Sequence, residues 1–270
     1  MPSPEPPSSS LVYVQHEDVL TLVGEPVELT RTSRIVVAKA DGFYAEALRR
    51  ACAQAFPGTT AEICRTSAAL LQALRQRPAD FALIGLTFAD GDGLDVLEAN
   101  ARGQLARRVF IISSRKDEHT LWALRAARFD GWFDPTEESA TALAPALQQV
   151  AGGRGYISPG LSGRWIERRS GGVLNQRLTL AERLVFSVIG DGTDDGAAAQ
   201  RLGLSKATIQ SHRRNLMRKL DVATSAKLVA EAVRLGVVRI LPDGEIVRPA
   251  YERIHAEWQA KRRRSPLGEK

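Results

Sequence analysis

The segment from Ser205 to Leu220 carries side chains whose types and spacing suit the recognition of nucleic-acid bases. On a helix, one stripe of this segment combines small, amide, hydroxyl and guanidinium groups, which pack on or hydrogen-bond to base edges in the DNA major groove. This stripe consists of Ala207, Gln210, Ser211, Arg214 and Arg218. The opposite stripe consists of Ile209, His212, Leu216 and Leu220 and is expected to face a core. The segment is therefore predicted to be a helix that packs by one face and reads DNA with the other.

The charge of the same region favours contacts with phosphate groups. Between Gly196 and Leu220 the chain has six basic residues and no acidic one, and its net charge of +6 suits a polyanionic partner. The basic residues placed for phosphates are Lys206, Arg213, Arg218 and Lys219. A solvated basic helix would give the same pattern, so the pattern alone leaves both interpretations open.

Several polar side chains of this segment have two interpretations. Ser205 precedes the helix and can cap it by accepting a first-turn N–H group. Thr208 can donate to a phosphate or take part in local capping, and Asn215 can contact a base or the DNA backbone. His212 is expected to be packed or bonded to phosphate rather than to a metal, because no second histidine or cysteine lies near it.

Three further helices must position this one. The pattern predicts a helix from Leu178 to about Ile189, a turn at residues 191–193, a helix ending near Leu202 and a tight turn at residues 203–204. Asp194 or Asp195 can cap the second of these helices, although a carboxylate there repels any phosphate that approaches. A last helix, from Ser225 to Leu235, should end at Gly236 in the left-handed conformation. Residues 178–238 are thus expected to contain four helices.

Upstream, apolar runs alternate with helical patterns from Arg34 to Ala151. The predicted strands are Ile35–Ala38, Thr60–Cys64, Phe81–Leu86, Val109–Ser113 and Gly131–Phe133. The predicted helices are Phe43–Ala55, Ala68–Arg77, Leu94–Ala101, Glu118–Ala127 and Thr141–Ala151. Five strands alternating with five helices predict an α/β domain, a doubly wound parallel sheet, over residues 34–151.

Several stretches carry a family resemblance. Residues 78–97 (PADFALIGLTFADGDGLDVL) resemble the third strand and following loop of response-regulator receiver domains, and residues 123–132 resemble their fourth helix and fifth strand. Residues 153–159 (GRGYISP), 178–183 (LTLAER) and 205–220 are similar to successive parts of the LuxR/FixJ-type (NarL-type) response regulators. The resemblance covers roughly residues 34–238. It implies a receiver-like domain followed, at residues 178–238, by a LuxR-type DNA-binding domain, an all-α four-helix helix-turn-helix domain.

The resemblance also implies roles for residues. The family reads bases at the positions of Gln210, Ser211 and Arg214. Glutamine pairs bidentately with adenine and arginine with guanine, so Gln210 and Arg214 are suited to different bases. The exposed part of the helix at residues 225–235 is expected to form a homodimer that binds two half-sites on double-stranded DNA.

The phosphorylation site of the receiver is degenerate at its acceptor. Gly85 stands at the acceptor position, and Lys39 and Ala40 stand where an acidic pair would hold Mg²⁺, with only Asp41 nearby. The Lys39 ammonium can stand in for the metal charge, pair with Asp41 or Asp90, or be a plain surface lysine. The domain is therefore interpreted as a pseudo-receiver kept for its surfaces.

The remaining receiver positions are also altered. The hydroxyl position keeps Ser113, whereas the lysine position falls on Asp134 or Pro135, neither of which supplies an ammonium group. Asp90 and Asp92 lie in the loop beyond the third strand, where a structural role is favoured over that of a substitute acceptor.

The outer segments carry less information. Residues 1–33 form an N-terminal extension with a Pro/Ser-rich, disordered start, in which LVYVQ, VLTLVG and VELT look like strands. Residues 152–177 are taken as a linker. In residues 239–270 a hairpin is predicted around Pro242-Asp243-Gly244, followed by a helix with the apolar stripe Tyr251, Ile254 and Trp258. Its basic end, residues 261–264, can contact the DNA backbone or simply be solvated.

Composition restricts the class of protein. The two cysteines, Cys52 and Cys64, form no disulfide framework or metal cluster and are expected to be buried thiols rather than a redox switch. No signal peptide or membrane span is evident, so a cytoplasmic protein without cofactor or metal is expected. We find no nucleophile–base pair or phosphate-binding loop, and an enzyme is not favoured.

The sequence predicts a DNA-binding transcription regulator controlled without aspartyl phosphorylation. Control would act through its concentration, its dimerisation, or a protein partner or small ligand at the receiver-like domain. The alternative is an adaptor that titrates another regulator through that domain.

Overall fold

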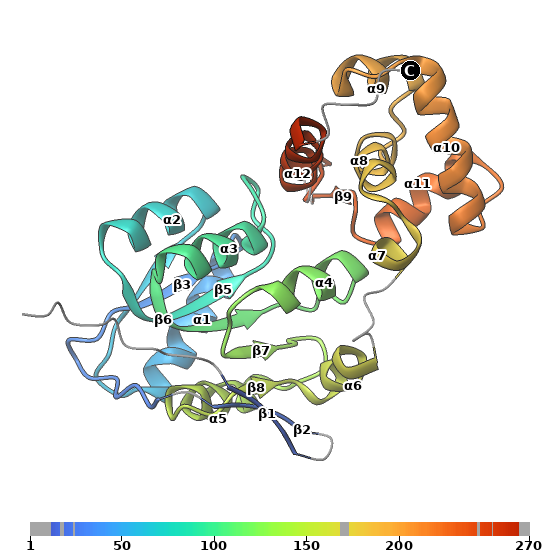
Figure 1. Ribbon diagram of the computed structural model, residues 1–270. Helices are drawn as coiled ribbons and strands as arrows, with labels where there is room; N and C mark the ends of the chain where they lie inside the picture. Colours follow the sequence, from blue (N-terminus) through green and yellow to red (C-terminus); the bar gives the residue numbers. More distant parts are fainter. Residues whose placement is uncertain are drawn as a thin grey trace, which may run out of the picture. The chain divides into compact units, whose positions relative to one another are not determined.

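The computed structural model describes residues 12–16, 19–23, 25–167, 173–241, 244–249 and 251–264, and Figure 1 shows its elements. The contacts between residues divide the chain into two compact units. The first comprises Met1–Arg115 and Leu124–Ile166, and the second comprises Lys116–Ala123 and Glu167–Lys270. No helix among the described residues is long and apolar enough to cross a membrane.

The first unit is built on a parallel sheet with the strand order β4-β3-β5-β6-β7-β8. Its strands are β3 (Ile35–Ala38), β4 (Ala61–Cys64), β5 (Ala79–Gly85), β6 (Ala106–Ile112), β7 (Gly131–Phe133) and β8 (Tyr156–Ile157). The helices that connect them within this unit are α1 (Gly42–Ala55), α2 (Ser67–Gln76), α3 (Gly93–Gly103) and α5 (Ala140–Ala151). Helix α4 (Glu118–Ala126) follows β6, and its residues up to Ala123 are assigned to the second unit. In Figure 1, α1 and α5 lie on one face of the sheet and α2 and α3 on the other. The doubly wound parallel fold is confirmed.

The predicted number of five strands is wrong by one, because β8 adds a sixth strand. It pairs with β7 through Gly131 with Tyr156 and Trp132 with Ile157. A strand of two residues is too short to produce a periodic signal. The segment expected as a linker therefore contains β8 and also the helices α6 (Pro159–Glu167) and α7 (Val173–Arg177).

Continuous apolar runs explain the central strands. All four residues of β3 and nearly all of β5 are buried, as expected for strands covered on both faces. Aromatic rings of Phe81, Phe110 and Phe133 pack in sequence across the sheet. A Cβ at position 131 would be 2.4 Å from a ring carbon of Phe110, so glycine is required there.

At the N-terminus, β1 (Val12–His16) and β2 (Val19–Val23) form an antiparallel hairpin, as LVYVQ and VLTLVG predicted. The predicted strand at VELT is wrong. Val27 is buried and donates one backbone hydrogen bond to the carbonyl of Ala151, but residues 27–30 pair with no strand. Residues 1–10 lie outside the described part of the chain.

The second unit contains the predicted four helices around one core. They are α8 (Leu180–Ile189), α9 (Asp195–Leu202), α10 (Lys206–Leu220) and α11 (Ser225–Arg234). Thr179 and Glu182 form a reciprocal capping box at the start of α8, and Gly203 closes α9 with φ of 62°. Gly236 follows α11 with φ of 76°, which confirms the predicted left-handed stop.

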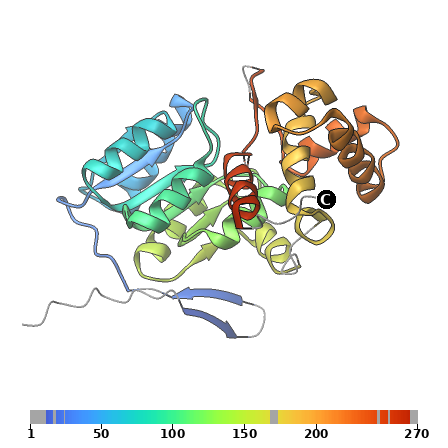
Figure 2. The same ribbon diagram turned by 45° about the horizontal axis from the view of Figure 1, so that its top comes forward.

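A C-terminal hairpin follows, and a C-terminal helix completes this core. The hairpin β9 (Arg239–Ile240) with β10 (Ile246–Val247) is confirmed, although residues 242–243 of its turn lie outside the described chain. Helix α12 (Tyr251–Arg264) lies alongside α8 (Figures 1 and 2). Tyr251 and Ile254 are buried in the same core, and Trp258 packs on it, so the predicted apolar stripe is confirmed.

Candidate nucleic-acid interface

Helix α10 presents one exposed face to solvent. Its exposed residues are Lys206, Ala207, Gln210, Ser211, Arg214 and Arg218. They recur at the spacing of a single helical face, while Ile209 and Leu216 on the opposite side have no exposed surface. In the described part of the chain, the side chains of Gln210, Arg214 and Arg218 take part in no hydrogen bond or ion pair. These donors are therefore available to an external acceptor.

Two other cations of α10 are engaged within the domain. The Nε of Arg213 donates to Oδ1 of Asp195 at 2.8 Å and its Nη2 donates to the carbonyl of Thr193 at 3.1 Å. The Nζ of Lys219 donates to Oε2 of Glu182 at 2.6 Å. Burial raises the pKa of Glu182, but hydrogen bonds from Lys219 and Thr179 outweigh it and hold the pKa below its ordinary value. Sequence position alone had grouped Arg213 and Lys219 with the phosphate-binding residues.

The polar side chains that the sequence left with two interpretations differ in their hydrogen bonds and burial. The hydroxyl groups of Ser205 and Thr208 lie 2.7 Å apart, and Ser205 accepts the Thr208 N–H at 3.0 Å, a capping arrangement. Asn215 is half-buried. His212 is also half-buried, and its Nδ1 is enclosed without a hydrogen-bond partner. Among the described residues no three His, Cys, Asp or Glu side chains are grouped to hold a metal ion.

The N-terminus of α9 is capped by its own chain. Oδ1 of Asp194 accepts the N–H groups of Gly196 at 2.7 Å and Ala197 at 3.1 Å. These hydrogen bonds lower the pKa of the Asp194 carboxyl group. Since free N–H groups at a helix N-terminus are what bind phosphate, this carboxylate already occupies that position.

In the first unit, Gly85 is the last residue of β5, and Lys39 fills the space beside it. A Cβ atom at position 85 would lie 3.0 Å from Cδ of Lys39 and 3.2 Å from the carbonyl of Ala38. The Lys39 ammonium lies 4.9 Å from the ring centroid of Tyr44 and forms no ion pair with Asp41 or Asp90. Burial lowers the pKa of Lys39, and the charge of Asp41 partly opposes that shift.

Arg115, which the sequence did not single out, ties together the loops around Gly85. Its Nη1 donates to the carbonyl of Leu86 at 2.6 Å and to the two carboxylate oxygens of Asp92 at 2.9 and 3.1 Å. Its backbone N–H donates to Oγ of Ser113 at 3.1 Å. The only signal in the sequence was a basic residue just after a buried strand.

The loop acids have structural partners. Asp90 accepts the N–H groups of Ser67 and Ala68 at the start of α2, and Asp92 also accepts the Leu94 N–H at the start of α3. Asp134, one of the two residues expected at the lysine position, is buried and accepts from the N–H and hydroxyl of Thr136.

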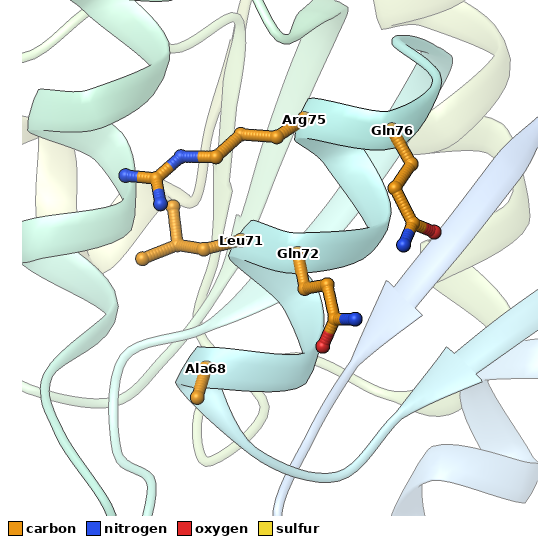
Figure 3. A pocket seen from close by; sticks show the side chains of 5 residues that line it. All are labelled: Ala68, Leu71, Gln72, Arg75 and Gln76. Carbon is orange, nitrogen blue, oxygen red and sulfur yellow. The ribbon is translucent and has the colours of Figure 1, made fainter.

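A shallow hollow of about 470 Å³ opens on the first unit. Figure 3 shows that its lining side chains all project from α2; they are Ala68, Leu71, Gln72, Arg75 and Gln76. It contains no acid, thiol or histidine, so it has the chemistry of a helix surface rather than of a catalytic or metal site.

Residues 176–232 match the family model described as bacterial regulatory proteins, luxR family. This stretch of the second unit is therefore similar to LuxR-family domains. The match begins just before α8 and includes all of α9 and α10, as the sequence resemblance predicted. It ends within α11, so the β9–β10 hairpin and α12 lie beyond the LuxR-family model, although Tyr251 and Ile254 of α12 belong to the core of the domain.

Curated relatives extend the likeness toward the N-terminus. The transcriptional regulatory protein MctR of Rhizobium johnstonii is 27% identical over 168 residues, which cover 61% of this chain and 76% of the relative. The probable transcriptional regulatory protein NarL of Mycobacterium tuberculosis is 28% identical over 205 residues, covering 74% and 94%. Among solved structures, RcsB from Salmonella enterica serovar Typhimurium bound to promoter P1flhDC with BeF₃⁻ has a TM-score of 0.52 at 21% identity, over 73% of this chain and 96% of that one. At an identity of 21%, this structural similarity shows a shared fold only.

Proposed function

We propose that this protein is a sequence-specific DNA-binding transcription regulator whose receiver-like unit works without aspartyl phosphorylation. The observation that carries the proposal is the exposed face of α10, on which Gln210, Arg214 and Arg218 have no partner among the described residues. Unsatisfied amide and guanidinium donors on one face of a rigid helix match the edges of bases in the major groove.

The reading face is suited to two different bases. Arg214 is proposed to donate to the O6 and N7 atoms of guanine and Gln210 to pair with adenine, with Ser211 beside them. Gln210 and Arg214 are one helical turn apart, about 6 Å along the axis, which is close to two base-pair steps. Lys206 and Arg218 are proposed to bind phosphates, because both are exposed at the margins of this face. Thr208 and Asn215 remain candidate backbone contacts.

Binding is proposed to be dimeric. Leu228 and Ala232 of α11 are buried, whereas Val233 is 41% exposed, so α11 keeps apolar surface for a second copy. Two recognition helices related by symmetry would read two half-sites.

Three features support control without phosphorylation. Gly85 offers no carboxylate, the stem of Lys39 takes the adjoining space, and Arg115 holds Asp92. Phosphoryl transfer needs an acceptor and a bound Mg²⁺, neither of which these groups supply. Incubation with acetyl phosphate and Mg²⁺ should leave the intact mass unchanged, and a stoichiometric phosphoryl adduct would refute this part of the proposal.

The DNA-binding part is tested with the full-length protein and a library of promoter fragments. Fragments should be retained in a salt-dependent way, and Arg214→Ala should relax the preference at one base position of the selected site. Arg75→Ala is the matched control, since Arg75 is an exposed arginine on α2 of the other unit and should leave both affinity and preference unchanged.

A second candidate, an adaptor that titrates another regulator, is favoured by one observation. Asp194 occupies the N-terminus of α9 and places negative charge where a phosphate would approach. Salt-dependent retention without any sequence preference would favour this function over specific regulation.

A further inference from the structure

The cations of α10 fall into two sets that sequence position does not separate. Arg213 and Arg214 are neighbours in the chain, but Arg214 is exposed whereas the side chain of Arg213 is only 17% exposed. We propose that Arg213 is a positioning residue, which clamps α10 to α9 through Asp195 and makes no contact with DNA. The inference deepens the proposed DNA-binding function and rests on it.

The geometry of Arg213 directs its guanidinium group inward. Nε and Nη2 bond to Asp195, the first residue of α9, and to the carbonyl of Thr193 just before it. Asp195 is itself only 19% exposed. Because the guanidinium is planar, donating from two of its nitrogens toward α9 fixes the orientation of the whole group. A partly buried pair of this kind is screened by salt much less than a surface pair.

Helix α9 benefits from such a clamp because most of its buried side chains are small. Its first half reads Asp-Gly-Ala-Ala-Ala, and its buried residues are Ala198, Ala199 and Leu202. Alanine side chains bury little apolar surface, so they define the angle between α9 and α10 weakly. The turn between the two helices contains Gly203 at positive φ, a residue with a wide conformational range. The Asp195–Arg213 pair supplies a directional tie at the end of α9 that is far from this turn.

A second tie holds the other end of the recognition helix. Lys219, in the last turn of α10, bonds to Glu182 of α8. Helix α10 is thereby fixed near its middle to α9 and near its end to α8. The charges left for DNA are Lys206, Arg214 and Arg218, so phosphate binding by α10 is expected to involve fewer cations than its composition indicates.

The experiment compares the affinity of the full-length protein for its selected fragment across a series of salt concentrations. Loss of a phosphate contact in Arg218→Ala should reduce the slope of log K against log salt by about one. Arg213→Met, which keeps an apolar stem, should lower the affinity roughly tenfold with an unchanged slope.

The variant Asp195→Asn gives the sharpest contrast. It removes a negative charge and releases Arg213, so a DNA-contacting Arg213 predicts tighter binding. A positioning Arg213 predicts weaker binding of the same size as in Arg213→Met, and the double variant should be no weaker than either single one. Tighter binding by Asp195→Asn, or a slope reduced by about one in Arg213→Met, would overturn the proposal.

A measurement without DNA separates this inference from the proposed function. The melting-temperature shifts of Asp195→Asn and Arg213→Met should be non-additive if the two residues form a clamp. Additive shifts would refute the clamp even if the protein binds DNA. If the unmodified protein retains no fragment at any salt concentration, the proposed function fails while the melting experiment still tests the clamp.

Discussion

The side chain of Lys39 lies over Gly85, so that a Cβ atom at position 85 would be 3.0 Å from Cδ of Lys39 and 3.7 Å from its ammonium nitrogen. The side chain of Lys39 thus occupies space that a side chain at position 85 would use. A larger side chain at position 85 therefore requires the side chain of Lys39 to move.

Gly85→Asp should not by itself create a phosphorylatable protein. The new carboxylate would lie beside the Lys39 ammonium and pair with it, and no acidic pair is present at residues 39–40 to hold Mg²⁺. The intact mass should stay unchanged after treatment with acetyl phosphate and Mg²⁺. Gly85→Asn controls for size, and it should melt at a lower temperature than Gly85→Asp because it lacks the ion pair. A phosphoryl adduct on Gly85→Asp would show that Lys39 does not block the site.

Arg115→Ala should destabilise the first unit by about 3–5 kcal/mol, because it leaves the carboxylate of Asp92 without its guanidinium partner in a buried site. Urea denaturation measures the change. Arg102→Ala is the matched control, since Arg102 pairs with Glu98 on the surface and its loss should cost less than about 1 kcal/mol. Equal effects of the two substitutions would contradict a structural role for Arg115.

The Lys219–Glu182 pair should make stability depend on pH. The pKa of Glu182 in the folded protein lies below its ordinary value, so the pair contributes stability above the unfolded pKa of about 4.3. That contribution should be lost as the pH falls through the lower, folded pKa. Urea unfolding between neutral and acid pH measures the profile, and Glu182→Gln should flatten it in this range. An unchanged profile in Glu182→Gln would assign the acid sensitivity to other carboxyl groups.

The C-terminal helix should be essential to the stability of the DNA-binding unit. Ile254→Ala removes a buried side chain from the core shared with α8 and should cost about 2–4 kcal/mol. Glu257→Ala, on the exposed side of the same helix, should change stability by less than about 0.5 kcal/mol. Chemical denaturation followed by tryptophan fluorescence measures both, because Trp258 packs on this core. A negligible effect of Ile254→Ala would mean that α12 is dispensable.

Apolar patterns in the sequence were sufficient to predict the strands and helices that bury several residues along one face. The runs at β3 and β5 and the stripe of α12 predicted their elements, because periodicity reports burial directly. Two strand predictions failed. The two-residue strand β8 was not predicted, and VELT was predicted as a strand because its residues favour one, although it makes only one backbone hydrogen bond, to Ala151.

The sequence predicted where the candidate site lies, but not which of its charged side chains form ion pairs within the protein. Helical spacing identified the exposed face of α10, since that requires only local geometry. It could not separate Arg213 from Arg214, because the acid that engages Arg213 is 18 residues away and becomes its neighbour only in the folded domain. Arg115 was missed for the same reason, with its partner Asp92 23 residues earlier in the chain.

The packing of α12 against α8 has a consequence for synthesis of the protein on the ribosome. Helices α8 to α11 emerge first, but the core that they begin is completed only when Tyr251 and Ile254 arrive. A nascent chain, or a fragment cut between α11 and α12, would present the recognition helix on an incomplete domain with apolar surface exposed. Cellular proteases should therefore remove such fragments preferentially.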